Sequence, residues 1–357
     1  MNDPVDAIDR VIEDAIRAQV FPGAVVLVTR EGIVRKQAAY GYAVLYRTFK
    51  ERRPDPVPMT TTTIFDLASL TKVVATTTAI LQLVDAGRVD LDAPAWTYLP
   101  GFGRVGKRAI TVRHLLTHTS GLPAIRHFYK RLQGQSEIVD AVERTRPVGR
   151  PGAQVVYSDL GFIALGALVA AVTGEALDAY TNTHIVRPLG MHDTLYRPPA
   201  SLRPRIAATE VQPLRGLVWG EVHDENAQAM SGVSGHAGLF GTAADLGVFC
   251  TLLLDGGSRG AVRIVQPATL QQMFTVQTGL LTPSHGLGWR CNEPSFMGTL
   301  ASLRTFGHTG FTGTSIVLDL VRRLSVILLT NRVHPTRHGP DLAPVRAAVA
   351  DAAASLV

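Results

Sequence analysis

The stretch Phe65-Asp-Leu-Ala-Ser69-Leu-Thr-Lys72-Val-Val-Ala decides how this chain is interpreted. It continues as an apolar run that stops near Gly87, and this pattern predicts a single long helix. Because residues three apart share one face of a helix, the Ser69 hydroxyl and the Lys72 amine can meet. A lone Ser-x-x-Lys match is weak evidence by itself, since a surface lysine on an amphipathic helix produces the same pattern.

The chemistry of this pair would be that of an activated nucleophile. A serine hydroxyl reacts slowly until a neighbouring base takes its proton. An amine can be that base at neutral pH if burial or a nearby cation lowers its pKa. No other charged residue lies between Asp66 and Asp85, so we expect the pKa of Lys72 to be lowered. Ser69 and Lys72 are therefore the first candidate catalytic residues.

The composition points to a folded protein: of its 357 residues, 46% are hydrophobic and 18% are charged. Such a chain can bury a sizeable core, and extensive disorder is excluded. The net charge of +6 comes with scattered arginines and without a basic stripe or nucleic-acid motif, so no nucleic-acid partner is expected. No apolar stretch has the length of a membrane span or of a signal-peptide core. We therefore expect a cytoplasmic protein with no membrane partner.

The cysteines and histidines show no convincing metal-ligand spacing. Cys250 and Cys291 lie far apart, and Cys250 falls in an apolar run that predicts a buried structural thiol. His114 and His118 stand four apart, but the Leu-Leu-Thr between them lacks the glutamate of the zinc-protease pattern, which favours a structural role. We expect neither a metal nor an organic cofactor.

Mixed helix and strand patterns at both ends of the chain enclose a mostly helical middle. The predicted elements are a helix over 4–19, strands over 23–29, 33–42, 303–308, 314–320 and 324–330, and a closing helix over 342–354. The polar, proline-rich segment 47–59 is predicted to be a loop. We expect an α+β fold in which residues 1–66 and 235–357 form one lobe, an antiparallel sheet flanked by helices. Residues 67–234 would form an inserted, mostly helical lobe, with the active-site cleft between the two lobes.

A second motif, Tyr157-Ser158-Asp159, opens a predicted helix over 161–172. A phenol near two cations can be held as phenolate and can serve as a general base or acid. The alternative is a helix cap, in which Ser158 or Asp159 caps the helix and Tyr157 packs locally. Both can hold together, so Tyr157 is the next candidate catalytic residue.

A third motif, Gly-His308-Thr309-Gly310-Phe311-Thr-Gly, lies between two predicted strands. On its own it could be a glycine-rich turn. It does not fit a phosphate-binding loop, because neither a Gly-Lys-Ser/Thr sequence nor a helix follows. Glycines let a strand backbone approach a substrate closely, and a neighbouring backbone N–H could join that of Ser69 in holding an oxyanion.

In this order and at similar spacing, the three motifs resemble the serine β-lactamase and penicillin-binding-protein superfamily, especially its class C-like, esterase-like members. The matching motifs are Ser-x-x-Lys at Ser69-Leu-Thr-Lys72, Tyr-x-Asn at Tyr157-Ser-Asp159 and Lys/His-Thr-Gly at His308-Thr-Gly310. Further similar stretches are 114–123, 235–242 and 286–289, and the resemblance covers roughly residues 8–355. It implies the β-lactamase-like fold.

The resemblance also implies a serine hydrolase that forms an acyl-enzyme. Ser69 would attack a carbonyl while Lys72 and Tyr157 share the acid/base work, and a water activated by Tyr157 would then release the acid. The residues implied to bind the substrate or its oxyanion are Asp159, His308, Thr309, Gly310 and Phe311. The implied substrate is a small carboxylic ester or amide, and the oligomeric state is not predicted.

Two departures from the family pattern favour an esterase or amide hydrolase over a β-lactamase. Asp159 stands where the family more often has asparagine, so an amide that donates to substrate becomes a carboxylate that can counterbalance Lys72. His308 replaces the lysine that penicillin-recognising members use near the substrate carboxylate, and a neutral imidazole selects anions less strongly. β-Lactamase, D,D-peptidase, D-aminopeptidase and acyltransferase activities remain alternatives, as does a non-catalytic module that binds a peptide or β-lactam.

Three other features are weaker candidates for function. Gly256-Gly-Ser-Arg-Gly260 fits the Gly-x-Ser-x-Gly nucleophile elbow, but a predicted helix precedes it and a strand follows, the reverse of what an elbow needs. His236 lies in a glycine-rich segment and could approach the cleft, without an assigned role. Trp289 is expected to be a packing residue or part of the cleft wall.

Overall fold

The computed structural model describes residues 4–356 and is built on a seven-stranded antiparallel sheet. Its strand order is β11-β12-β13-β14-β1-β2-β3, so strands from the two ends of the chain meet at the β14–β1 pair. The strands of this sheet are β1 (Gly23–Arg30), β2 (Ile33–Tyr46), β3 (Arg52–Pro58), β11 (Arg290–Cys291), β12 (Thr305–Thr309), β13 (Thr314–Asp319) and β14 (Leu324–Thr330). This arrangement confirms the predicted α+β fold.

The remaining strands are short and lie outside the large sheet. A three-stranded sheet has the order β4-β8-β5, and two further pairs are the hairpins β6–β7 and β9–β10. These strands are β4 (Phe65–Asp66), β5 (Leu195–Tyr196), β6 (Val211–Gln212), β7 (Gly216–Leu217), β8 (Leu239–Gly241), β9 (Ser258–Arg259) and β10 (Val262–Arg263). The β4–β8 pair matters for the site, because β4 leads directly into the segment that carries Ser69.

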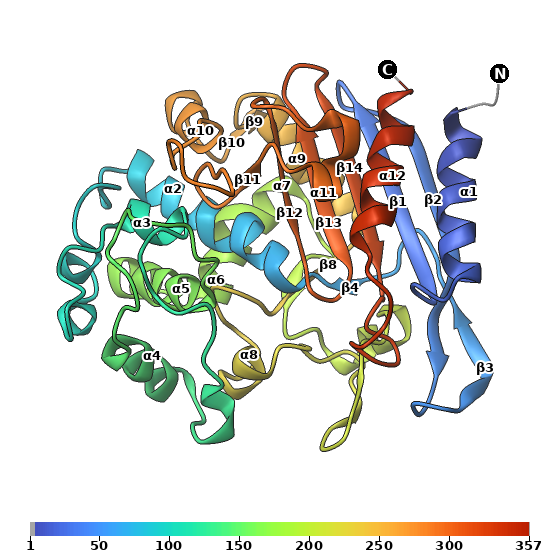
Figure 1. Ribbon diagram of the computed structural model, residues 1–357, viewed down its shortest axis with the longest axis horizontal. Helices are drawn as coiled ribbons and strands as arrows, with labels where there is room; N and C mark the ends of the chain where they lie inside the picture. Colours follow the sequence, from blue (N-terminus) through green and yellow to red (C-terminus); the bar gives the residue numbers. More distant parts are fainter. Residues whose placement is uncertain (1–3, 357) are drawn as a thin grey trace.

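The α-helices cover both faces of the large sheet and form the rest of the molecule (Figure 1). They are α1 (Pro4–Arg17), α2 (Thr78–Asp85), α3 (Val112–Leu116), α4 (Gln135–Arg144), α5 (Asp159–Thr173), α6 (Leu177–Thr181), α7 (Arg187–Leu189), α8 (Glu225–Ala229), α9 (Ala243–Leu254), α10 (Pro267–Met273), α11 (Pro294–Met297) and α12 (Ala343–Ala354). In residues 4–356, no single helix is long and apolar enough to span a membrane; a pair bent by 79°, α5 with Leu177–Leu189, passes by length and composition.

The central strand β1 is buried on both faces of the sheet. Side chains alternate between the faces of a strand, so Val26 and Val28 join one buried cluster while Val25 and Leu27 join another. Helices α1 and α12 close the first cluster and lie side by side in Figure 1. Helix α9 contributes to the second, larger cluster, which extends through the helical part of the molecule. The continuous apolar run of β1 thus reflects burial on two sides.

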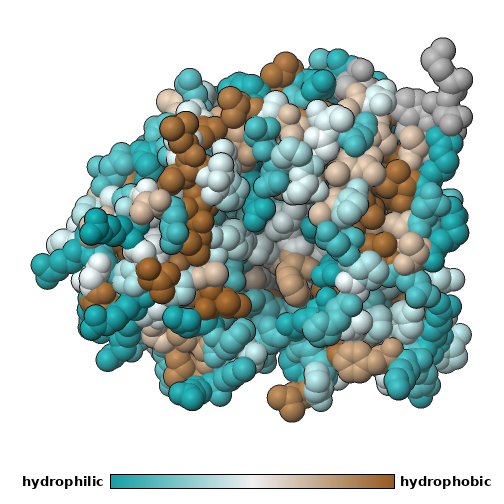
Figure 2. Space-filling model, in the orientation of Figure 1, coloured by the Kyte–Doolittle hydropathy of each residue, from teal (hydrophilic) through white to brown (hydrophobic). Residues whose placement is uncertain are grey.

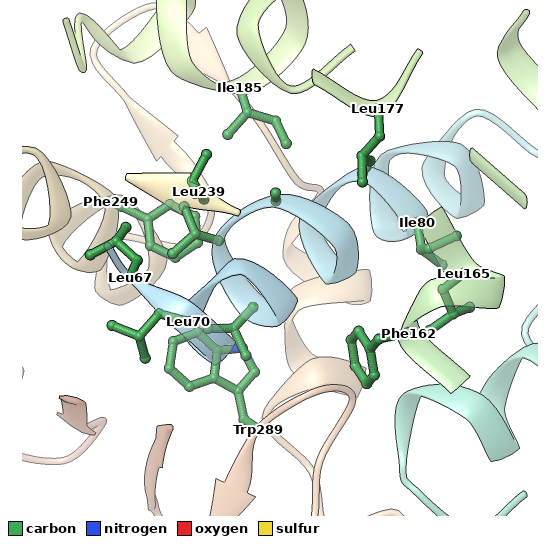
Figure 3. Packing of buried hydrophobic residues seen from close by; sticks show 14 of the residues in the cluster. Leu67, Leu70, Ile80, Phe162, Leu165, Leu177, Ile185, Leu239, Phe249 and Trp289 are labelled. Carbon is green, nitrogen blue, oxygen red and sulfur yellow. The ribbon is translucent and has the colours of Figure 1, made fainter. Parts of the chain in front are cut away.

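The segment that follows β4 is less regular than the single helix predicted. It begins as a 3-10 turn (Ala68–Leu70), continues as a π-helical stretch (Lys72–Thr77) and becomes regular only in α2. Its buried surroundings explain why it is apolar on every side. Figure 3 shows side chains from several segments packed around it, among them Phe162, Leu165, Leu239, Phe249 and Trp289.

One predicted loop is wrong. Within 47–59, residues Arg52–Pro58 form β3, which pairs with β2 at the edge of the large sheet. Its prolines, Pro54, Pro56 and Pro58, are tolerated because an edge strand needs hydrogen bonds on one side only. The register of the β2–β3 pair is irregular, in keeping with this composition.

Candidate active site

Ser69 lies on the 3-10 turn Ala68–Leu70, which leads into the π-helical stretch Lys72–Thr77 and then α2, together called the central helix below. The Lys72 side chain folds back, and its Nζ donates a hydrogen bond to Ser69 Oγ at 2.9 Å. Ala68, just before the serine, has φ = +46°, a left-handed conformation that is costly for a residue with a Cβ atom. Ser69 is partly exposed, whereas Lys72 is fully buried. The pairing predicted from the three-residue spacing is therefore present, although the helix is not regular.

Lys72 is enclosed by groups that favour its ammonium form. Besides Ser69, its Nζ contacts Asp159 Oδ1 at 2.8 Å and donates to the carbonyl oxygen of His236 at 3.1 Å. Burial alone would lower the pKa of Lys72, but the Asp159 carboxylate and then Tyr157 favour the charged form more, and its pKa is raised. The predicted lowering is therefore wrong, because the carboxylate that reverses it comes from a distant part of the chain.

Tyr157 and Asp159 reach Lys72 from the start of α5. The residue between them, Ser158, is the N-cap: its Oγ accepts from the N–H of Gly161 at 3.4 Å and donates to the carbonyl oxygen of Pro123 at 2.7 Å. Lys72 Nζ lies 4.9 Å from the centroid of the Tyr157 ring. Ser158 can therefore cap α5 while its neighbours Tyr157 and Asp159 reach Lys72. The cap fixes the backbone of Ser158 and so helps to set the positions from which the two neighbouring side chains extend.

The third motif is the end of β12, and it lies against the segment that carries Ser69. Thr314 Oγ1 donates to the carbonyl oxygen of Leu67 at 3.0 Å, and Thr312 Oγ1 donates to that of Asp66 at 2.7 Å. A Cβ atom at Gly310 would lie 2.6 Å from the Leu67 oxygen, so a larger residue there would push the two segments apart. Glycine is therefore required for this close approach.

His308 is buried beside Tyr157, with the ring centroids 6.0 Å apart. Its Nδ1 donates to the carbonyl oxygen of Thr309 at 3.0 Å. Burial, together with the charges of Lys72 and Arg290, lowers the pKa of His308 well below its ordinary value. The imidazole is therefore neutral at pH 7, as the comparison with the family's lysine suggested.

A pocket of about 410 Å³ lies at Ser69 and is lined by residues of all three motifs. The pocket-lining residues that the motifs supply are Ser69, Tyr157, Asp159, His308, Thr309, Gly310 and Phe311. Figure 2 shows this face of the molecule hollowed near its centre, where the central helix of Figure 1 begins. Two exposed apolar side chains, Ile125 and Phe311, also line the pocket, with 43% and 51% of their surface exposed.

Asp224 and His236 form a polar pair in the same pocket; His236 was expected to approach the cleft, whereas Asp224 was not predicted. His236 Nε2 bonds Asp224 Oδ1 at 2.9 Å, and its Nδ1 bonds Ser234 Oγ at 2.8 Å. These two bonds hold His236 in place, and the backbone carbonyl of His236 accepts a hydrogen bond from Lys72. The glycine-rich stretch 235–242 was a signal for His236, but nothing near Asp224 marked it.

Three arginines, which we call the basic wall, line the pocket and were also missed: Arg290, Arg332 and Arg346. Arg346 Nη2 donates to the carbonyl oxygens of Gly310 and Thr314, at 3.0 and 2.9 Å. Burial, and next the charge of Arg332, lowers the pKa of Arg346 to about 10. A fourth arginine, Arg337, has its charge balanced by Glu210, since its Nε donates to Glu210 Oε2 at 2.7 Å; within the basic wall, Arg290 Nη1 lies 3.8 Å from Glu293 Oε2. No spacing predicts the basic wall, since its members come from separate elements.

The weaker candidates lie outside this arrangement. Ser258 begins β9 of a short hairpin, so the Gly256–Gly260 stretch is no nucleophile elbow. Trp289 is fully buried in the larger core, and Cys250 and Cys291 are free, buried thiols. Within residues 4–356, no group of three or more His, Cys, Asp or Glu side chains could hold a metal ion.

Comparisons with known proteins agree with this geometry. The family model described as Beta-lactamase matches residues 8–351. The chain is 37% identical to the N-acetylmuramyl-L-alanine amidase of Bacillus subtilis (strain 168), over 94% of this chain and 83% of that protein. It is 34% identical, over 91% of this chain and 81% of the other, to an Escherichia coli (strain K12) protein whose name proposes D-alanyl-D-alanine carboxypeptidase activity.

A solved structure shows the same fold at lower identity. EstCE1, described as a hydrolase with promiscuous acyltransferase activity, has a TM-score of 0.77 and 24% identity, and the match covers 98% of both chains. The family model spans nearly the whole chain, and the two sequence relatives exceed 30% identity. This chain belongs to the beta-lactamase family of serine hydrolases.

Proposed function

We propose that this protein hydrolyses a carboxylic amide or ester by an acyl-enzyme mechanism in which Ser69 is the nucleophile. One observation carries the proposal: Lys72 Nζ contacts both Ser69 Oγ and Asp159, beside the Tyr157 ring, at a pocket that can admit a substrate. Lys72 thus links the Ser69 oxygen to Asp159 and lies beside the Tyr157 ring, which supports activation of the serine by this group.

The ion pair assigns different roles to Lys72 and Tyr157. Because Asp159 keeps Lys72 as an ammonium, Lys72 is a hydrogen-bond donor that orients Ser69 Oγ, and Tyr157 is the group that takes the serine proton. The Ser69–acyl bond forms as the carbonyl π bond gives an oxyanion, which the N–H groups of Ser69 and Phe311 would stabilise. Tyr157 then passes the proton to the leaving amine or alkoxide, whose bond to the acyl carbon breaks.

Deacylation would repeat these steps with water. Tyr157 takes a proton from the attacking water, the acid leaves, and the proton returns to Ser69 Oγ. The position of Gly310 against Leu67 supports the oxyanion assignment, because it holds the Phe311 backbone next to the turn that carries Ser69.

The basic wall supports an anionic amide as the substrate. Arg346 places positive charge beside Gly310 and Arg332 lines the same pocket, whereas His308 is neutral. The names of the two sequence relatives, an N-acetylmuramyl-L-alanine amidase and a D-alanyl-D-alanine carboxypeptidase, both refer to alanine-containing molecules. We therefore propose that the substrate is a small acylated alanine peptide of the peptidoglycan type, whose carboxylate lies against the basic wall.

Parallel turnover measurements would test the substrate. We expect N-acetylmuramyl-L-alanine, with its carboxylate free, to be hydrolysed at its amide bond with a higher kcat/KM than a D-alanyl-D-alanine peptide or nitrocefin. Substituting Arg332→Gln should raise KM for the carboxylate substrate and leave that for a neutral amide unchanged. Equal KM changes for both substrates would contradict the role of the basic wall.

Ester hydrolysis is the second candidate, favoured by the exposed apolar side chains of Ile125 and Phe311 in the pocket. Hydrolysis of short p-nitrophenyl esters at a higher rate than every amide tested would support ester hydrolysis.

A fluorophosphonate probe separates both activities from a non-catalytic binding module. The probe should label the wild-type protein and not Ser69→Ala; a folded wild type that stays unlabelled would overturn the enzymatic proposal. The cytoplasmic location stays a prediction, which cell fractionation would test.

A further inference from the structure

His118 is a buried histidine that the proposed mechanism does not use. It follows α3, has 1% of its surface exposed and adopts φ = +57°. We propose that His118 is a positioning residue for Tyr157. This inference rests on the proposed function, in which Tyr157 takes the proton of Ser69.

His118 holds the backbone on both sides of Tyr157. Its Nδ1 accepts a hydrogen bond from the N–H of Ser158 at 3.0 Å. Its carbonyl oxygen accepts another from the N–H of Val156 at 2.8 Å. The two bonds leave Tyr157 between two anchored neighbours, so His118 acts together with the Ser158 cap to fix the backbone position of Tyr157.

The imidazole also packs against the phenol ring. The ring centroids of His118 and Tyr157 are 4.4 Å apart, and the Phe162 centroid lies 5.1 Å from that of His118. Because Lys72 Nζ is 4.9 Å from the Tyr157 centroid, the ring contacts both a fixed cation and a fixed imidazole. Such contacts restrict the phenol to one orientation towards Ser69.

The acceptor role of Nδ1 requires a neutral imidazole. An N–H that points at Nδ1 leaves the ring proton on Nε2, and a proton on both nitrogens would break the bond to Ser158. The surroundings keep the ring neutral: burial lowers its pKa well below the ordinary value, and so do the facing cationic or titratable groups, which are His285, Lys72, His308 and Arg290. The hydrogen bond to Ser158 is therefore kept throughout the neutral pH range.

The backbone of His118 restricts what can replace it. Left-handed φ values are unfavourable for most side chains, but asparagine and histidine adopt them more often than others do. Strain at a non-glycine residue next to a reacting group is typical of functional positions. Asparagine can keep both the φ value and a hydrogen-bond acceptor, whereas phenylalanine keeps only an aromatic ring.

The test compares His118→Phe, His118→Asn and a matched control, His114→Asn, which lies four residues earlier, in α3. His114 caps α3, and its imidazole bonds Thr111 rather than a neighbour of Tyr157. Turnover is divided by the number of sites that a fluorophosphonate labels, so that misfolded molecules are not counted. We expect His118→Phe to lower kcat about 10- to 100-fold with little change in KM, since small misplacements of catalytic groups have effects of this size. His118→Asn should recover most of the loss, and His114→Asn should keep wild-type kcat.

A double-mutant cycle with Tyr157→Phe completes the test. If His118 acts through the phenol, His118→Phe should have no further effect on kcat in the Tyr157→Phe background. Additive losses would overturn the proposal, as would wild-type kcat per labelled site in His118→Phe or equal losses in the Phe and Asn variants. If Tyr157→Phe alone kept wild-type kcat, the proposed function of Tyr157 would fail instead, so the two failures are distinguishable.

Discussion

Lys72 and Lys107 are both fully buried, yet their surroundings have opposite effects on their charge. Lys107, near α4, donates to the carbonyl oxygens of Glu143 and Thr145 at 2.6 and 2.9 Å, and burial lowers its pKa to about 8. Lys72 has the same burial, but the Asp159 carboxylate at 2.8 Å reverses the effect and raises its pKa.

This comparison teaches that burial alone does not make a lysine a base. Neutral carbonyl dipoles satisfy the donors of Lys107, and the nearby Glu143 carboxylate favours its charged form too weakly to offset desolvation. The Asp159 carboxylate, at contact distance, does compensate the desolvation of Lys72. Lys72 therefore stays charged, which suits it to orient the Ser69 hydroxyl rather than to take the proton of Ser69. The lysine with the lowered pKa is therefore the one remote from the catalytic cluster.

Replacing the two lysines should give the largest difference. We expect Lys72→Ala to lower kcat by about 10³-fold, since it removes the donor to Ser69 and leaves Asp159 unpaired. Lys107→Ala should lower the melting temperature while kcat per labelled site stays within about threefold of wild type, because its partners are structural carbonyls. Steady-state kinetics after active-site titration checks both. A similar kcat loss in both variants would remove the distinction between the two regions.

Asp159→Asn should make Lys72 more like Lys107. Without the carboxylate, burial dominates and the pKa of Lys72 falls, so the ammonium is lost at a lower pH. We expect kcat at pH 7 to fall about tenfold and the alkaline limb of the pH profile to move to lower pH. The exposed carboxylate Asp140 offers the control: Asp140→Asn should leave the profile unchanged. Overlapping profiles of Asp159→Asn and wild type would show that Asp159 does not hold Lys72 charged.

The pH dependence of stability should give the smallest effect. The pKa of Lys107 is about 8 in the folded protein, whereas its ordinary value, which applies to the unfolded chain, is 10.5. Between pH 8 and pH 10.5, the unfolded state therefore binds more protons than the folded state. Stability therefore rises with pH across this window. We expect the melting temperature to gain roughly a few degrees more in wild type than in Lys107→Met between pH 8 and 10.5. Lys130→Met, at an exposed lysine, should behave as wild type. A wild-type slope in Lys107→Met would contradict the lowered pKa.

Local patterns predicted most of the fold. Strands β1, β12, β13 and β14 and helices α1 and α12 lie close to their predicted ranges, because their hydrophobic periodicity matches their burial. The β3 strand was missed because prolines obscure an edge strand. The irregular turns after β4 were missed because an apolar sequence does not distinguish α-, 3-10 and π-helical hydrogen bonding.

The sequence by itself determined which residues could form the catalytic cluster. The three-residue spacing of Ser69 and Lys72 makes their contact a local matter, and Ser158 caps α5 through its own near neighbours. Gly310 likewise indicates that the backbone passes close to another segment, which is the one that contains Leu67. These properties depend on short-range geometry, which the order of residues carries directly.

Only the tertiary structure decided the charge of Lys72 and the presence of the basic wall. Each depends on groups from separate segments that meet in space, such as Asp159 with Lys72 or Arg332 with Arg346. Electrostatic effects vary with distance and burial, and the order of residues does not state either quantity for distant pairs. The chemistry of Ser69 therefore rests on contacts that appear only when the chain is folded.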